Sequence, residues 1–281
     1  MIRLNAMMGD HAVTAALKSG AIGSNRVALD FADVKVPNTA FKRAVRDLEF
    51  DVAELAIVTF LIARAAGKPL LLLPAVLVSR MQHSFLVHNA ERGALAPRKL
   101  EGRRVGVRSY SVTTGMWVRA ILAGDFGVDT DRINWVTFEE PHVAEFKAPP
   151  NVERAPAGSD IEAMLLSGGI DAAILGKKPG DPRIQPLIGD LAGAEAAWTK
   201  RTGAIQINHM VAVRESLGSE TAREVYRMLL ESRHAAGDPA ANPFGVESNR
   251  HSLEVAIDCV WRQNLIPRRY AVGELFGGYF D

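Results

Sequence analysis

Two patterns of apolar residues alternate along the chain. Short apolar runs bounded by turn residues predict strands, and apolar positions that recur every three to four residues predict helices. The strands are expected at residues 3–8, 27–31, 50–52, 70–73, 84–87, 105–107, 133–136, 172–175, 205–207 and 210–213. The helices are expected at residues 12–20, 39–48, 54–66, 115–123, 160–166, 221–234 and 248–263. This alternation is typical of an α/β fold.

The pattern restarts after a polar stretch at residues 89–104, which contains Gly93, Pro97 and Gly102. The segment that follows has a strand, a helix and further strands of its own. We interpret the polar stretch as the first crossing between two lobes.

Composition narrows the function classes. The 281 residues carry a formal net charge of +1 with both signs interspersed, which argues against a nucleic-acid-binding face. The longest apolar stretches, 55–66 and 70–78, are too short and too interrupted to span a membrane. The N-terminus, MIRLNAMMGDHAV, lacks the pattern of a secretory leader, so we expect a cytoplasmic protein. A mature exported protein whose leader has been removed would have the same pattern.

Several common chemistries lack their motifs. There is no G-x-S-x-G, no G-x-G-x-x-G and no P-loop. The seven histidines include no pair four residues apart on a helix, and the single cysteine forms no cluster. We therefore expect neither a metal site nor a bound cofactor.

The loop at residues 108–115 follows a predicted strand and opens a predicted helix, so free N–H groups and hydroxyls converge there. We expect it to bind an anion; an N-terminal cap with nothing bound is the alternative. Its candidate binding residues are Arg108, Ser109, Tyr110, Thr113 and Thr114.

Asp10 and His11 lie in the first strand-to-helix loop of the chain. Asp10 fits either a helix cap or a substrate contact. Glu54 opens an apolar helix in this prediction, where the helix dipole alone favours an acid. A direct catalytic role for Glu54 is the competing interpretation.

Two histidines are candidates for moving protons, because histidine titrates near neutral pH. His83 follows Arg80 just before a predicted strand near the lobe crossing. His209 follows Asn208 and precedes the strand at 210–213. We expect His83 or His209 to act as acid or base, and Arg80 and Asn208 to contact substrate.

Four segments together carry a family resemblance. They are FKRAVRDLEFDVAELAIVTFL (41–61), LEGRRVGVRSYSVTTGMWVRAIL (100–122), LLSGGIDAAI (165–174) and NPFGVESNRHSLEVAIDCVWRQNLIPRRYAVGELF (242–276). These segments resemble 4,5-dihydroxyphthalate decarboxylases and their binding-protein relatives. The resemblance implies a two-lobed, periplasmic-binding-protein type II-like α/β fold. Each lobe would be a mixed sheet flanked by helices, with a ligand cleft between them. Lobe 1 would comprise residues 1–98 and 204–281, and lobe 2 would be inserted as residues 99–203.

The resemblance also implies decarboxylation of a small anionic aromatic substrate, a hydroxylated phthalate, without a cofactor. A base would deprotonate the hydroxyl para to a carboxylate, and an acid would protonate the ring carbon before CO₂ leaves. Arg80 and Arg108 would hold carboxylate, and Thr113 and Thr114 would donate hydrogen bonds.

Two alternatives on the same scaffold stay open. One is the substrate-binding protein of an ABC transporter for a small aromatic or sulfonate anion, and the other is a menaquinone-pathway enzyme. Whether the protein forms a homo-oligomer is also open, because the C-terminal helix and tail fit packing on their own lobe or on a neighbouring subunit.

Overall fold

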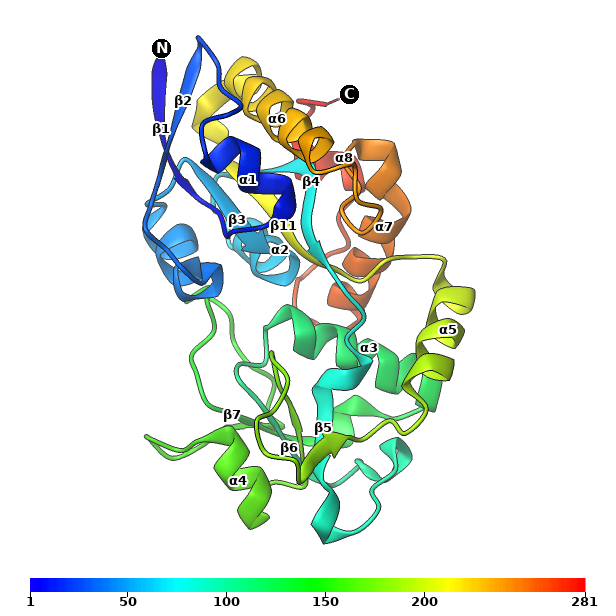
Figure 1. Cartoon of the computed structure of the whole chain (residues 1–281). Helices are drawn as coiled ribbons and strands as arrows, with labels where there is room; N and C mark the ends of the chain where they lie inside the picture. Colours follow the sequence, from blue (N-terminus) through cyan, green and yellow to red (C-terminus); the bar gives the residue numbers. More distant parts are fainter. Residues whose placement is uncertain (281) are drawn as a thin grey trace. The chain divides into compact units, whose positions relative to one another are not determined.

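The chain folds into two compact units, shown in the computed structural model of Figure 1. The structure describes residues 1–280. Unit 1 is built from residues 1–80 and the described residues from Ile205 onward, and unit 2 is Met81–Ala204. Unit 2 is therefore inserted into unit 1. Residue 281, the expected end of lobe 1, lies outside the described residues.

Unit 1 contains a mixed five-stranded sheet in the order β2-β1-β3-β11-β4. Its strands are β1 (Ile2–Met7), β2 (Val27–Phe31), β3 (Val52–Ala56), β4 (Leu70–Ser79) and β11 (Ile207–Arg214). Strand β1 runs parallel to β2 and β3, whereas β11 runs antiparallel to β3 and β4. The two strands predicted at 205–207 and 210–213 are thus the single strand β11.

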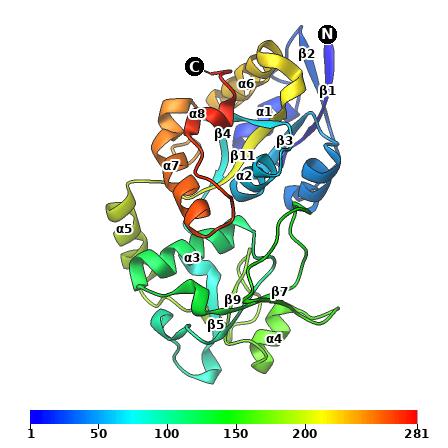
Figure 2. The same ribbon diagram turned by 180° about the vertical axis from the view of Figure 1, so that it is seen from behind.

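Helices cover both faces of this sheet. Helices α1 (Ala12–Lys18) and α6 (Gly218–Ala235) pack against each other on one face, and α2 (Ile57–Ala65) and α7 (Val246–Arg262) pack on the other (Figures 1 and 2). The short helix α8 (Val272–Phe276) contacts β4. Within residues 1–280, no helix has the length and hydropathy required to cross a bilayer.

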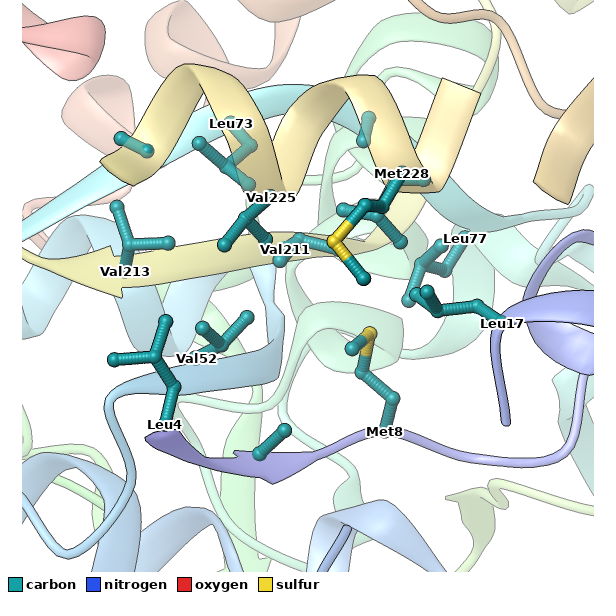
Figure 3. Packing of buried hydrophobic residues seen from close by; sticks show 14 of the residues in the cluster. Leu4, Met8, Leu17, Val52, Leu73, Leu77, Val211, Val213, Val225 and Met228 are labelled. Atoms are coloured by element: carbon teal, nitrogen blue, oxygen red, sulfur yellow. The ribbon is translucent and has the colours of Figure 1, made fainter. Parts of the chain in front are cut away.

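The core beneath α1 and α6 is mainly aliphatic and includes Met8 and Met228. Figure 3 shows Val225 and Met228 of α6 above Val211 of β11, with Met8 and Leu17 close to the tip of Met228. Valine, leucine and methionine side chains of this kind each stabilise the fold by about 1.5–3 kcal/mol when fully buried. This packing fixes the end of β1 and the start of α1, which matters for the site below.

Unit 2 contains a six-stranded mixed sheet in the order β10-β5-β9-β6-β7-β8. Its strands are β5 (Leu86–Asn89), β6 (Arg104–Val107), β7 (Asn134–Thr137), β8 (Val152–Arg154), β9 (Ala172–Ile174) and β10 (Ile184–Pro186). Its helices are α3 (Thr113–Phe126), α4 (Ile161–Ser167) and α5 (Leu191–Thr202), seen in Figure 2.

Short turns of helix connect these elements. The 3₁₀ turns are Pro37–Thr39, His83–Phe85, Ala90–Arg92, Pro97–Lys99, Thr130–Arg132 and Glu215–Leu217. A π-helical turn occupies Arg43–Asp47, where the sequence predicts an ordinary helix at 39–48.

The predicted helix at 54–66 begins too early. Residues 52–56 form the strand β3, and α2 starts only at Ile57. Every residue of β3 is buried, because helices cover both sides of the sheet. A strand buried on both faces shows no polar alternation and cannot be distinguished from a buried helix by periodicity. Glu54 therefore lies in a central strand, and the helix-dipole explanation for it is wrong.

The first crossing between units comes earlier than the predicted boundary at 98/99. The chain leaves unit 1 after Arg80, and β5 pairs with β9 in the sheet of unit 2. Sequence shows that a strand exists at this place, but only long-range pairing decides which sheet it joins. The return crossing, between Ala204 and Ile205, lies one residue from its predicted place.

Candidate functional site

Glu54 is completely buried in the sheet of unit 1, at 0% exposure, and three nitrogen atoms surround its carboxylate. The backbone N–H of Gly9 donates to Oε2 over 2.7 Å, and His11 Nε2 lies 2.9 Å from the same oxygen. His209 Nδ1 lies 2.6 Å from Oε1. We call Glu54, His11 and His209 the His-Glu-His cluster.

Strand pairing brings Glu54 and His209 together. In the antiparallel ladder of β3 and β11, Ala56 faces His209 and Glu54 faces Val211. Glu54 and His209 are therefore diagonal neighbours on one face of the sheet, within reach of long side chains. This is the face that α1 and α6 cover, because Val52 and Val211 belong to the core beneath those helices.

The loop after β1 brings His11 to the cluster. Thr14, fully buried in α1, fixes the loop: its Oγ1 donates to the carbonyl of Gly9 over 2.9 Å and accepts the backbone N–H of His11 over 3.1 Å. His11 occupies the N-cap position of α1, but this cap uses its backbone only. The imidazole is therefore available for Glu54.

Glu54 is held as a carboxylate. Burial by itself raises the pKa of Glu54, but hydrogen bonds from His11 and His209, together with their charges, outweigh burial and lower the pKa to about 2. An ionised carboxylate only accepts hydrogen bonds, so both facing ring nitrogens carry protons.

The side chains of His11 and His209 are both partly exposed. His11 is 24% exposed and His209 is 19% exposed in their side chains. Among residues 1–280, no hydrogen bond engages His11 Nδ1 or His209 Nε2. Phe41 packs edge-on to the His209 ring, with centroids 5.4 Å apart at 75°, which restricts the ring's rotation. The cluster thus presents two oriented imidazoles backed by one buried charge.

Gly9 is required at its position because of close packing. A Cβ atom there would lie 2.8 Å from His11 Nε2, 2.9 Å from Pro37 Cγ and 3.2 Å from Glu54 Oε2. Distances this short force side chains or backbone to shift.

We expect Gly9→Ala to destabilise unit 1 by about 1–3 kcal/mol, the usual cost of overpacking. The midpoint of urea-induced unfolding measures this change. Gly23→Ala is the matched control, because nothing lies within 4 Å of a Cβ atom at that position. Equal midpoints for the two variants would show that the loop tolerates a methyl group and that the packing is looser than described.

The third catalytic candidate, His83, lies in unit 2, apart from the Glu54–His209 pair of unit 1. It is completely buried, and its ring meets Trp198 edge-on with centroids 6.2 Å apart. Within residues 1–280, neither ring nitrogen of His83 has a hydrogen-bond partner. Burial lowers the pKa of His83, partly opposed by the charge of Asp125 and reinforced by that of Arg201. These surroundings hold a neutral imidazole in an apolar setting.

A buried neutral histidine should make unit 2 sensitive to acid. The folded state keeps His83 unprotonated, whereas the unfolded chain takes up a proton as the pH falls below about 6.5. Stability is therefore complete above this pH and is lost as the pH falls below it.

We expect His83→Phe to unfold within about 1 kcal/mol of the wild type at pH 7, since two unpaired nitrogens are replaced by a ring of similar shape. At pH 5 the variant should lose less stability than the wild type, as measured by denaturant unfolding at both pH values. A larger acid loss in the variant would mean that His83 is charged when folded.

The polar loop of unit 2 has the predicted position between β6 and α3. Arg108 Nη1 donates to Glu139 Oε2 over 2.9 Å, so its charge already has an acidic partner. Arg119, buried in α3, donates from Nη2 to the carbonyl of Tyr110 over 2.9 Å and lies over the Tyr110 ring, 4.0 Å from its centroid. The other candidates of this loop are also buried: Ser109, Thr113 and Thr114. The loop is therefore fixed from inside unit 2.

The remaining candidates differ in exposure. Asp10 is exposed and forms an ion pair with Lys18, so its side chain is not the cap of α1. Arg80 is exposed at the end of β4, where its backbone N–H donates to the Gln206 carbonyl over 3.3 Å. Asn208 is buried in β11 beside His209. None of these belongs to the hydrogen bonds around Glu54.

His11 is the residue of the cluster to which the sequence assigns no role. His11 lies in the loop between a strand and a helix, and this position is a signal that could have suggested a functional residue. The signal does not identify Glu54 as its partner. Across the described chain, no group of three or more His, Cys, Asp or Glu residues is arranged to hold a metal ion.

Comparison with known proteins gives two curated relatives, both named 4,5-dihydroxyphthalate decarboxylase. The protein from Comamonas testosteroni is 32% identical over 197 residues, which are 66% of this chain and 60% of that protein. The protein from Pseudomonas putida is 31% identical over 175 residues, which are 58% of this chain and 68% of that protein. The match thus spans less than two thirds of the first relative, 60%, and 68% of the second. The chain matches no family model.

Solved structures establish the fold. The periplasmic aliphatic sulphonate binding protein SsuA from Escherichia coli superimposes with a TM-score of 0.54 at 15% identity, covering 100% of both chains. The alkanesulfonate-binding protein SsuA from Xanthomonas axonopodis pv. citri gives 0.54 at 13% identity, covering 97% of both chains. The desulfurization enzyme DSZB gives 0.51 at 13% identity, covering 98% of this chain and 96% of that one.

The predicted fold class, two mixed sheets flanked by helices as in periplasmic binding proteins, is therefore confirmed. The chain is 31% identical to the Pseudomonas putida protein and covers 68% of its length. This similarity identifies the family as well as the fold. The chain belongs to the 4,5-dihydroxyphthalate decarboxylase family.

Proposed function

We propose that this protein removes CO₂ from a hydroxylated aromatic acid of the 4,5-dihydroxyphthalate type, with Glu54 and His209 supplying proton transfer. The observation that carries the proposal is the 2.6 Å contact between the buried Glu54 carboxylate and His209 Nδ1. The names of the two curated relatives support the same reaction.

The chemistry sets what the protein must supply. Direct loss of CO₂ from an aromatic carboxylate would leave an electron pair in a ring σ orbital, which is very costly. Protonation of the ring carbon that bears the carboxylate avoids this, because the C–C electron pair then returns to the ring as CO₂ leaves. The reaction therefore needs an acid that reaches a carbon atom.

His209 fits the role of this acid. Glu54 fixes the proton on Nδ1 and stabilises the imidazolium, so Nε2 can carry the proton that is delivered to the ring. A buried carboxylate does the same for histidine in serine proteases. Positioned acid–base catalysis of this kind accelerates reactions by about 10²–10⁴-fold.

The carboxylates of the substrate also need partners. Taking a carboxylate out of water without compensation costs several kcal/mol. We propose Arg80, which directly follows β4 in the same unit as His209, as a cationic partner.

Incubation of the purified protein with 4,5-dihydroxyphthalate tests the proposal. We expect equal amounts of CO₂ and 3,4-dihydroxybenzoate to form. Absence of turnover with this compound and with a panel of hydroxybenzoates would reject it. Binding of 4,5-dihydroxyphthalate without turnover, detected by calorimetry, would indicate a solute receptor instead.

A further inference from the structure

The two imidazoles around Glu54 differ in how they meet the carboxylate. Oε1 accepts from His209 alone, at 2.6 Å. Oε2 is shared between His11, at 2.9 Å, and the backbone N–H of Gly9, at 2.7 Å. More of the negative charge therefore remains available to His209 than to His11.

One carboxylate balances one positive charge. If both imidazoles were protonated, the cluster would carry a net positive charge in a largely buried place, and the two rings would repel each other. Because Oε1 accepts from His209 alone, His209 is the better placed of the two rings to deliver a proton. A neutral His11 with its proton on Nε2 has a lone pair on Nδ1, the nitrogen that no described residue engages.

Apart from its hydrogen bond to Glu54, the side chain of His11 makes no hydrogen bond within residues 1–280. The cap of α1 is made by the backbone N–H of His11 and by Thr14, and histidine is not among the residues preferred at that position. Its one hydrogen bond is to Glu54.

We propose that His11 is a second catalytic residue, the base that accepts the phenolic proton of the substrate while His209 delivers a proton to the ring carbon. This inference rests on the proposed decarboxylation. That reaction moves protons at two places on the ring, the hydroxyl oxygen and the carbon para to it, and one imidazole cannot serve both at the same moment.

The steps balance. His11 Nδ1 takes the proton of the hydroxyl, and the oxygen electron pair enters the ring. The ring carbon takes the proton from His209 Nε2. The bond from that carbon to the carboxylate breaks, its electron pair restores the aromatic ring, and CO₂ leaves. The product phenolate recovers its proton from His11, and His209 is reprotonated from water, so one proton is consumed for each CO₂ released.

Glu54 is the charged group that is hydrogen-bonded to the His11 ring. Asp10, in the same loop, forms an ion pair with Lys18 of α1, and Lys18 also donates to the Met8 carbonyl over 3.1 Å.

A comparison of two substrates separates the roles of the two histidines. The variants are His11→Gln and His209→Gln, and the substrates are 4,5-dihydroxyphthalate and a ring-fluorinated derivative, whose hydroxyl is more acidic. The readout is the kcat of CO₂ release. A base matters less when the hydroxyl gives up its proton easily. The acid matters at least as much, because fluorine also makes the ring carbon less basic.

We expect His11→Gln to lower kcat by about 10²–10³-fold on the parent substrate and by clearly less on the fluorinated one. His209→Gln should lose at least as large a factor on the fluorinated substrate as on the parent. If thermal unfolding shows that His11→Gln is not folded, His11→Ala with added imidazole replaces it, and recovery of kcat with imidazole supports the base role.

A wild-type kcat in His11→Gln, an equal loss on both substrates, or no recovery with imidazole would overturn the role of His11 while leaving the decarboxylation intact. Absence of CO₂ release by the wild type from either substrate would overturn both the proposed function and this inference.

Discussion

Glu54→Gln is expected to lower kcat for the proposed decarboxylation by about 10³–10⁴-fold, the size of loss seen when the carboxylate behind a catalytic histidine becomes an amide. The substitution keeps the shape of the side chain and removes its charge. A carboxylate accepts from all three nitrogens around it, whereas an amide has one oxygen to accept and an NH₂ group to donate.

The NH₂ group of the amide therefore forces one imidazole to change its tautomer, so that the nitrogen facing residue 54 accepts a hydrogen bond. If the NH₂ group faces His209, Nδ1 of His209 must become an acceptor and the ring proton moves to Nε2. In addition, no negative charge remains to stabilise an imidazolium at His209. Steady-state kinetics of CO₂ release measures the effect, and thermal unfolding verifies that the variant is folded.

The matched control is Glu49→Gln. Glu49 is also ion-paired, with Arg43, but at the surface of the same unit. We expect its kcat to equal that of the wild type. If Glu54→Gln had the same kcat as Glu49→Gln, the Glu54 carboxylate would have no part in the mechanism.

His209→Gln is the second large effect, with an expected loss in kcat of about 10²–10⁴-fold. Glutamine can still donate a hydrogen bond to Glu54, so the fold is retained, but it has no nitrogen that carries a transferable proton. The substrate makes its binding contacts elsewhere, so KM should change much less than kcat.

His234→Gln is the control for this change. His234 lies exposed on α6, where Nδ1 is 2.8 Å from Asp238, so the same chemical substitution is made at a histidine–carboxylate pair on the surface. A loss confined to KM in His209→Gln would mean that this residue binds substrate without moving a proton.

The order of the elements could largely be predicted from the sequence, because apolar periodicity is a local signal. The helices α6 and α7 lie within a few residues of their predicted ranges. The helix α5 is missed, since only Trp198 of its residues is buried and no apolar stripe results. Asp190 and Gly203, which cap its two ends, are the signals that could have found it.

The candidate site could be predicted only in part. Glu54 and His209 are both candidates from sequence, but for separate reasons, and 155 positions separate them in the chain. Their contact depends on the register of β3 against β11, which no local pattern specifies. Glu54 is misplaced in a helix because β3 is buried along its whole length and shows no polar alternation. His11, whose role depends on Glu54, therefore receives none.

His83 shows the opposite error. Its polar neighbours in the sequence suggest an accessible acid or base, yet it is buried beside Trp198 with no hydrogen bond among the described residues. The burial of His83 depends on Trp198, which is distant in the sequence. A local sequence pattern therefore could not predict it.

The measurement that tests the account most directly is a double-mutant cycle on kcat with Glu54→Gln, His209→Gln and the combined variant. Residues that act as one unit give losses that do not multiply. We predict that the double variant is about as slow as the slower single variant. A loss in the double variant equal to the product of the two single losses would contradict the claim that the buried carboxylate works through His209.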